Sequence, residues 1–128
     1  MVSKDNPKQG TEKEESLPPE VSEFLGEVIQ SSLMRYDVLR FFHQNPYAIL
    51  TVSDLSIWMS REEMPLAHAL QQLAALGYLA QSHASSAFVL TSDREKRRRV
   101  EEFFACMEDN RDVARRIRVR MRRQLEAE

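Results

Sequence analysis

The sequence predicts a mainly α-helical chain with one small β-hairpin. Apolar residues recur at helical spacing over residues 20–30 and again from Leu33 onward. Two short strand-like segments, 78–82 and 87–91, lie on either side of a polar turn. No glycine or proline follows position 92, which favours a helix over the rest of the chain. At 128 residues the chain suits one domain of ordinary size.

The composition excludes several classes of protein. Eighteen basic residues stand against twenty acidic ones, so the chain is not a uniformly basic coat for nucleic acid. A single cysteine excludes an internal disulfide framework and a cysteine-based zinc cage. There is no run of 18 apolar residues, and the polar first residues do not resemble a signal peptide. We therefore expect a cytoplasmic protein with no membrane association.

The charge is distributed unevenly along the chain. Residues 1–31 hold three basic and seven acidic residues, residues 32–91 three and four, and residues 92–128 twelve and nine. These counts give net charges of −4, −1 and +3. Attraction for a polyanion should therefore come mainly from the last segment.

The N-terminal part predicts a tail followed by one amphipathic helix. Residues 1–17 carry few apolar side chains and no periodicity, so we expect a disordered tail. Pro19 suits the first turn of a helix over 20–30. The buried face of this helix is expected to consist of Val21, Phe24, Leu25, Val28 and Ile29.

Capping signals mark the next two helices. Ser32 can cap a helix that ends before Pro46, and Ile49 with Leu50 could form a small edge strand. Thr51 and Asp54 have the spacing of a capping box, which opens a short helix over 52–59. The expected inward side chains of these two helices are Leu33, Tyr36, Val38, Leu39 and Phe42, then Leu55, Trp58 and Met59.

A further helix should run from near Met64 to Leu76. Pro65 fits its first turn, and Gly77 is the usual residue just past a helix end. The turn 83–86 then joins the two strand-like segments into a hairpin. The core stripe of this helix is expected to be Leu66, Leu70 and Leu73, and Ser92 with Glu95 predicts the cap of a long last helix over 93–125.

This order of elements resembles a winged helix-turn-helix domain. The stretch 38–91 is similar to bacterial transcription regulators of the MarR, ArsR and PadR kind. The resemblance rests on V-L-R-F-F at 38–42, T-V-S-D-L at 51–55, A-L-Q-Q-L-A-A-L-G-Y-L at 69–79 and F-V-L-T at 88–91. The predicted organisation is a tail over 1–17, a first helix with the winged helix over 18–91, and over 92–128 a helix that resembles the dimerisation helix of PadR-like proteins.

The resemblance implies a DNA-binding homodimer that acts in transcription regulation. The helix 64–76 would enter the major groove and the hairpin 78–91 would be the wing. Glutamine can pair with adenine, and histidine can donate to a base or a phosphate. The residues implied to contact DNA are Arg61, Pro65, Ala67, His68, Gln71, Gln72 and, in the wing turn, His83.

One departure from the family pattern leaves a second function open. Neither the helix 64–76 nor the turn 83–86 contains Lys or Arg, and Glu62 and Glu63 stand beside the helix start. Neutralisation of phosphates supplies essentially all non-specific affinity for DNA. The alternative is a winged-helix protein-interaction module with little intrinsic DNA binding, whose partner would be apolar or acidic.

The last helix carries an apolar stripe and an arginine face. Seven-residue spacing in the stripe favours pairing of two subunits along the helix, and packing on the chain's own first helices is the alternative. The arginine face either contacts a polyanion or is simply solvated. The stripe is Val100, Phe103, Met107, Ala114, Ile117 and Met121, and the arginines expected at DNA are Arg115, Arg118 and Arg122.

Nothing in the sequence predicts catalysis or a bound cofactor. The three histidines do not have the spacing of a metal site, and no glycine-rich phosphate loop or nucleophile with a paired base can be recognised. Cys106 lies beside the apolar stripe, where we expect a buried and unreactive thiol. We therefore expect neither an enzyme nor a metal centre.

Overall fold

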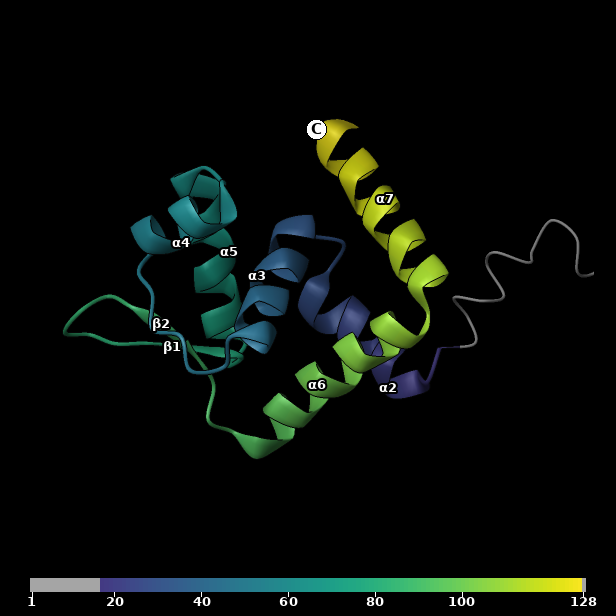
Figure 1. The fold of residues 1–128 in the computed structure, drawn as a ribbon, viewed down its shortest axis with the longest axis horizontal. Coiled ribbons are helices and arrows are strands. Elements are labelled where there is room, and N and C mark those ends of the chain that lie inside the picture. The colour runs from purple at the N-terminus through teal and green to yellow at the C-terminus, as the bar shows by residue number, and fades with distance from the viewer. Residues whose placement is uncertain (1–16, 128) are drawn as a thin grey trace, which may run out of the picture.

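The computed structural model describes residues 17–127, and the expected tail lies outside them except for its last residue, Leu17, which is buried. The predicted mainly helical chain with a small antiparallel sheet is confirmed. Helix α3 lies at the centre, with α4 and α5 on one side and α7 on the other (Figure 1). The elements are α2 (Pro19–Phe24), η2 (Leu25–Ile29), α3 (Leu33–Gln44), α4 (Val52–Met59), α5 (Glu63–Ala75), β1 (Leu79–Gln81), β2 (Phe88–Leu90), α6 (Arg94–Asp109) and α7 (Arg111–Ala127).

The first predicted helix is confirmed, with a change of form in its second half. α2 begins at Pro19, as expected, and the chain then widens into the π-helical turn η2. Gln30 and Ser31 end it with φ angles of 54° and 60° in the left-handed region. The predicted face is buried except for Leu25, which is half-buried.

α3 and α4 begin at the predicted caps. The Ser32 hydroxyl accepts a hydrogen bond from the Arg35 backbone N–H at 3.1 Å, and Thr51 forms the expected capping box with Asp54. All five predicted core residues of α3 are buried.

The prediction that Trp58 points inward from α4 is wrong. Only Leu55 is fully buried on this two-turn helix. Around the helix axis, Val52 and Met59 lie to one side of Leu55 and are half-buried. Trp58 lies to the other side of Leu55 and is 70% exposed.

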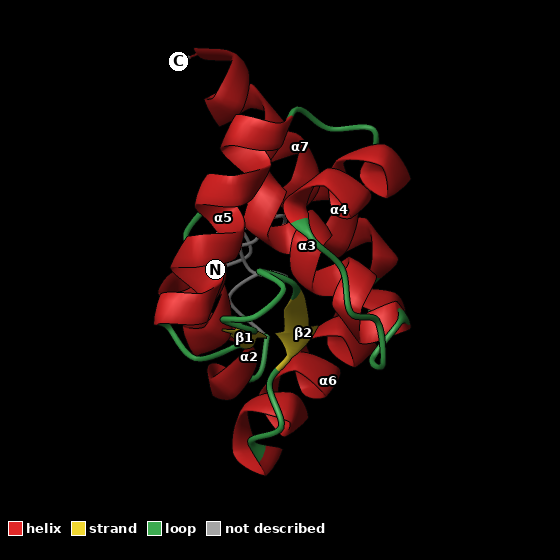
Figure 2. Cartoon of the chain, turned by 90° about the vertical axis from the view of Figure 1, so that its left-hand side faces the viewer, coloured by secondary structure: helices red, strands yellow, loops and turns green. Residues whose placement is uncertain are grey.

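α5 and the hairpin follow the prediction closely. Leu66, Leu70 and Leu73 are buried, and Pro65 lies in the first turn. Gly77 has a φ of 89°, and a Cβ there would lie 2.9 Å from Lys96 Cε, so this turn needs glycine. The strands pair with Leu79 opposite Leu90, below α4 and α5 in Figure 2. The expected edge strand at Ile49–Leu50 is reduced to one bridge, between Leu50 and Phe88.

The prediction of a single helix over 93–125 is wrong, because the helix is interrupted at Asn110. The Asn110 backbone N–H and side-chain amide both donate to the Cys106 carbonyl, at 3.0 and 2.9 Å. The backbone bond is the last regular one of α6, whereas the side-chain bond caps the helix end, and Asn110 leaves the helical region with φ −125° and ψ 65°. α7 therefore leaves α6 at an angle (Figure 1). The cap of α6 is Asp93 rather than Ser92, with Asp93 Oδ1 accepting from the Lys96 backbone N–H at 3.0 Å.

The apolar stripe of α6 and α7 packs inside its own chain. Its side chains are all buried except Ala114, which is half-buried. The break at Asn110 allows this, because α7 can turn back onto α3. The interpretation of the stripe as a free seam for a second subunit is therefore corrected. The stripe residues concerned are Val100, Phe103, Met107, Ala114, Ile117 and Met121.

Phe103 is the residue through which α6 meets α2 and α3. Its ring is fully buried, with centroids 4.8 Å from Phe24, 5.9 Å from Tyr36 and 5.0 Å from Phe104. Such aromatic pairs add to the free energy already gained from burial.

We expect Phe103→Ala to lower the free energy of unfolding by about 3–5 kcal/mol, because it leaves a cavity among three rings. Urea unfolding should show this loss at every protein concentration. Val119→Ala, at a partly exposed site on α7, should change the free energy by less than about 0.5 kcal/mol. A loss that varied with protein concentration would indicate packing between chains instead.

Candidate functional site

The residues expected to contact DNA do not form one exposed surface. Pro65, His68 and Gln71 are exposed on α5, and Ala67 is half-buried. His83 is exposed in the hairpin turn. Arg61, Gln72 and Arg118 are engaged in contacts within the chain, whereas Arg115 and Arg122 are exposed on α7.

Gln72 is one of those engaged residues. Its Oε1 accepts a hydrogen bond from Arg35 Nε at 3.1 Å, and its Nε2 lies 3.0 Å from His68 Nε2. Arg35 is buried and also donates to the Val28 carbonyl at 2.9 Å. Burial lowers the pKa of Arg35, so the Gln72 oxygen helps to solvate an otherwise costly charge.

Asp37 forms ion pairs with two arginines that were expected to contact DNA, Arg61 and Arg118. It forms an ion pair with Arg61, from the turn between α4 and α5. Its second oxygen accepts from Arg118 Nη1 of α7 at 2.7 Å, and the Arg118 guanidinium lies 5.3 Å from the centroid of the Tyr36 ring. One carboxylate on α3 thus binds both Arg61, which precedes α5, and Arg118 of α7.

Three exposed apolar side chains missed by the sequence analysis lie on α4 and at the start of α5, and we name this set the α4–α5 surface. Ile57, Trp58 and Met64 are 79%, 70% and 84% exposed. Glu62 and Glu63 stand between them in the chain and are exposed as well. Helical periodicity could have identified Ile57, which lies opposite Leu55, but gave no signal for Met64.

A groove of about 420 Å³ separates α5 from α7. Pro65 and His68 line it from α5, and Met121 and Leu125 line it from α7. Four of the residues expected to contact DNA therefore line a groove that faces the chain's own C-terminal helix: Arg61, Pro65, His68 and Gln72.

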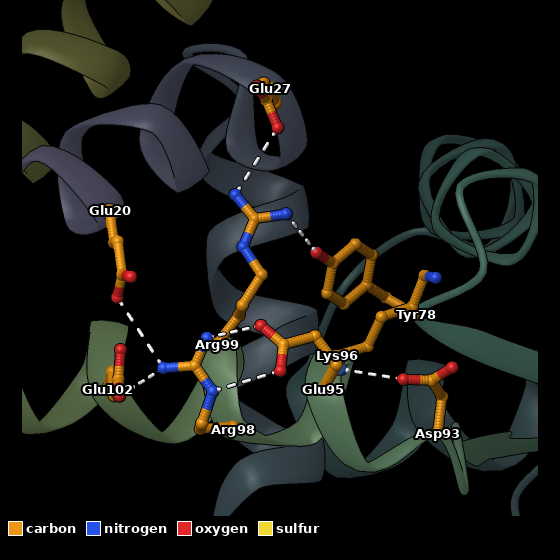
Figure 3. A network of polar contacts seen from close by, with 9 residues as sticks. All are labelled: Glu20, Glu27, Tyr78, Asp93, Glu95, Lys96, Arg98, Arg99 and Glu102. Carbon is orange, nitrogen blue, oxygen red and sulfur yellow. Dashed lines mark hydrogen bonds and ion pairs between the residues drawn. The ribbon is translucent and has the colours of Figure 1, made fainter.

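The basic run at the start of α6 is used within the chain (Figure 3). Arg98 pairs with Glu20 at 3.6 Å, Arg99 with Glu27 at 3.3 Å, and Arg99 also donates to the Tyr78 hydroxyl at 2.7 Å. Further contacts are Arg98 to Glu95 and Glu102, Arg97 Nε to the Thr91 carbonyl at 2.6 Å, and Lys96 over the Tyr78 ring at 5.9 Å. This run therefore fixes α6 in place.

The arginines of α7 differ in what they contact. Arg115 and Arg122 are exposed, while Arg118 is held by Asp37. Two buried atoms of Arg116, Nε and Nη2, lack a hydrogen-bond partner within the described residues. The exposed cations of α7 thus offer only part of the predicted arginine face.

Cys106 is half-buried near the break between α6 and α7. Burial is the main cause that raises the pKa of its thiol, and Asn110 Nδ2 donates to its sulfur at 3.6 Å. A raised pKa leaves less thiolate at neutral pH, which agrees with the expected low reactivity.

The structure and the comparisons identify no known class of site. Over residues 17–127 there is no group of three or more His, Cys, Asp or Glu side chains able to hold a metal ion. No helix in that range is long and apolar enough to span a bilayer. Comparison with protein-family models, curated proteins and solved structures finds no match.

We expect Asp37→Asn to weaken the attachment of α7 because it removes the charge shared by Arg61 and Arg118. The loss in unfolding free energy should be about 1–2 kcal/mol, less than for a fully buried pair, since both arginines are partly exposed. Amide hydrogen exchange should show faster exchange in α7 than in the native chain.

Glu101→Gln is the matched control, because Glu101 is an exposed carboxylate on α6 with no ion pair to another described residue, whereas Asp112 lies in the first turn of α7 and its charge would itself stabilise that helix. Equal exchange in both variants would show that Asp37 does not hold α7.

Proposed function

We propose that residues 33–91 form a winged helix-turn-helix that binds a protein partner and performs no catalysis. The order of α3, α4, α5 and the hairpin supports the fold assignment. The bridge from Leu50 to Phe88 supports it further, because it attaches the segment between α3 and α4 to the hairpin.

The observation that carries the protein-binding proposal is the exposed apolar surface of Ile57, Trp58 and Met64. Large apolar side chains exposed on an otherwise folded chain are typical of interaction sites, and tryptophan and methionine are enriched at interfaces. If these side chains met only water, they would add nothing to the free energy of folding.

Charge indicates the chemistry of the partner. Asp54, Glu62 and Glu63 are exposed on or between the same two helices, and α5 contains no Lys or Arg. An acidic partner, one of the earlier expectations, would be repelled. The surface best fits an apolar anchor flanked by Lys or Arg, such as a basic amphipathic segment.

The test is a photo-crosslinking amino acid placed at position 58. In the cells that make the protein, we expect one discrete crosslinked protein, because Trp58 is the exposed aromatic residue of the proposed surface. The same group at position 123, exposed on α7, is the matched control and should not yield that product.

Replacing both Ile57 and Met64 by Ser should abolish the product from position 58 without unfolding the chain, since both side chains are exposed. The proposal fails if position 58 yields no protein product, or if the product survives this double change.

DNA binding by a homodimer is the second candidate, and the exposed arginines of α7 favour it. Arg115 and Arg122 are available to phosphates, and His68 and Gln71 are exposed on α5. The expected regulator would occupy a two-fold operator.

If this second function holds, mobility shifts across salt concentrations should show tight, salt-dependent binding. Arg115→Gln with Arg122→Gln should lower the log–log salt slope by about one unit per lost phosphate contact. Gln71→Ala should change sequence preference more than the slope. The absence of any shift at low salt would exclude the DNA function.

A further inference from the structure

Arg116 of α7 is a half-buried arginine whose charge has no counter-ion among residues 17–127. Its Nε and Nη2 atoms are buried and have no hydrogen-bond partner within the same residues. The half-buried Arg118, by contrast, donates to the Asp37 carboxylate at 2.7 Å. Two guanidinium nitrogens held out of water without an acceptor are costly, which favours an acceptor supplied from outside the described part of the chain.

Arg116 belongs to one side of α7, which we name the Arg116 face. Arg116, Arg120 and Arg123 follow one another at spacings of four and three residues, so they lie along the same side of the helix. Arg118, which points to α3, lies on another side. Asp112, one turn before Arg116, is exposed and forms no ion pair with a described residue. Three arginines against one carboxylate give this face a positive charge that fits an acidic ligand.

The residues that precede Leu17 supply carboxylates. Glu12, Glu14 and Glu15 stand against a single lysine within residues 11–16, so this stretch, which we name the acidic segment, has a net charge of −2. Leu17 is buried and leads into α2, which packs on α6 (Figure 1). The acidic segment therefore joins the fold on the helix that leads into α7.

Length and tethering favour this segment over an acidic ligand in solution. Sixteen residues precede Leu17, and an extended chain of that length spans about 50 Å, whereas α7 is about 25 Å long. A tethered ligand competes at an effective concentration of roughly millimolar, which exceeds the concentration of most free ligands. Even a weak contact with α7 would then be occupied.

We propose that the acidic segment docks on the Arg116 face, where a glutamate accepts hydrogen bonds from Nε and Nη2 of Arg116. These two nitrogens form one edge of the guanidinium group, and a carboxylate binds such an edge through both of its oxygens. The docked segment covers cations of α7 that a polyanion would otherwise meet, so it acts as a built-in competitor. This role goes beyond the proposed function, because it does not involve the α4–α5 surface.

The first test places a photo-crosslinking amino acid at position 14 of the purified full chain. Irradiation in dilute solution should give crosslinks to α7 of the same chain, mapped by mass spectrometry of the monomeric product. Arg116→Gln with Arg123→Gln should lower their yield by about fivefold, because it removes the paired donors and the charge of the face. Arg115→Gln with Arg122→Gln removes the same charge from other exposed positions of α7 and should leave the yield unchanged.

The second test leaves α7 unaltered and uses heparin as the polyanion. The triple variant Glu12→Gln/Glu14→Gln/Glu15→Gln should bind heparin about 3- to 10-fold more tightly than the native chain, because the competitor has lost its charge. The matched control removes three carboxylates that are exposed and form no ion pair with a described residue, and it should raise the affinity less. This control is Glu23→Gln/Glu62→Gln/Glu101→Gln.

Three results would overturn the proposal. The first is crosslinks from position 14 that map outside α7 or that join only two separate chains, in which case a second copy supplies the segment. The second is a yield that survives Arg116→Gln with Arg123→Gln. The third is an equal heparin affinity of the two triple variants, or no heparin binding by either. None of these results bears on the crosslinking from position 58, so the two proposals can fail separately.

Discussion

The packing of Phe103 against Phe24 and Tyr36 is the contact on which the rest of the structure depends. It joins a residue of α6 to residues near the other end of the chain, and all three rings are buried. Without it, α6 and the following α7 would expose their apolar stripe, which soluble monomers rarely tolerate. The stripe therefore finds its cover within one chain, and a second subunit is not needed to bury it.

This packing also determines which charges remain for a ligand. Arg97, Arg98 and Arg99 bond to groups of the chain itself as α6 settles on α2 and the hairpin. A net charge of +3 after position 91 therefore overstates what a polyanion would meet. Among the described residues, Arg40, Arg111 and Arg115 form no ion pair and line the cavity where α6 and α7 meet.

Capping, stop and turn signals between neighbouring residues predicted the helices and the hairpin. The arrangement of the candidate site depends instead on pairs of residues far apart in the sequence. The Thr51 cap, the Gly77 stop and the hairpin were predictable because each is decided by a few neighbouring residues. The pairing of Arg61 with Asp37 joins residues far apart in the chain, and no spacing rule identifies it. The break at Asn110 was missed because asparagine within a helical pattern is only mildly unfavourable, and tertiary packing of α7 on α3 decided the outcome.

Asp37 also connects the α4–α5 surface with the cavity that α3, α6 and α7 line. Arg61 leads into α5 beside the apolar surface, and Arg118 forms part of the cavity wall, yet both depend on the same carboxylate. A ligand that drew Arg118 toward itself would leave more of Asp37 to Arg61, and a partner that displaced Arg61 would do the reverse. Linkage requires any such effect to be equal in both directions, so a ligand of the cavity and a partner at α4 and α5 would change each other's affinity by the same factor. The size of that coupling is limited by what one half-shared ion pair can contribute, about 1–2 kcal/mol, or roughly 5- to 30-fold in affinity.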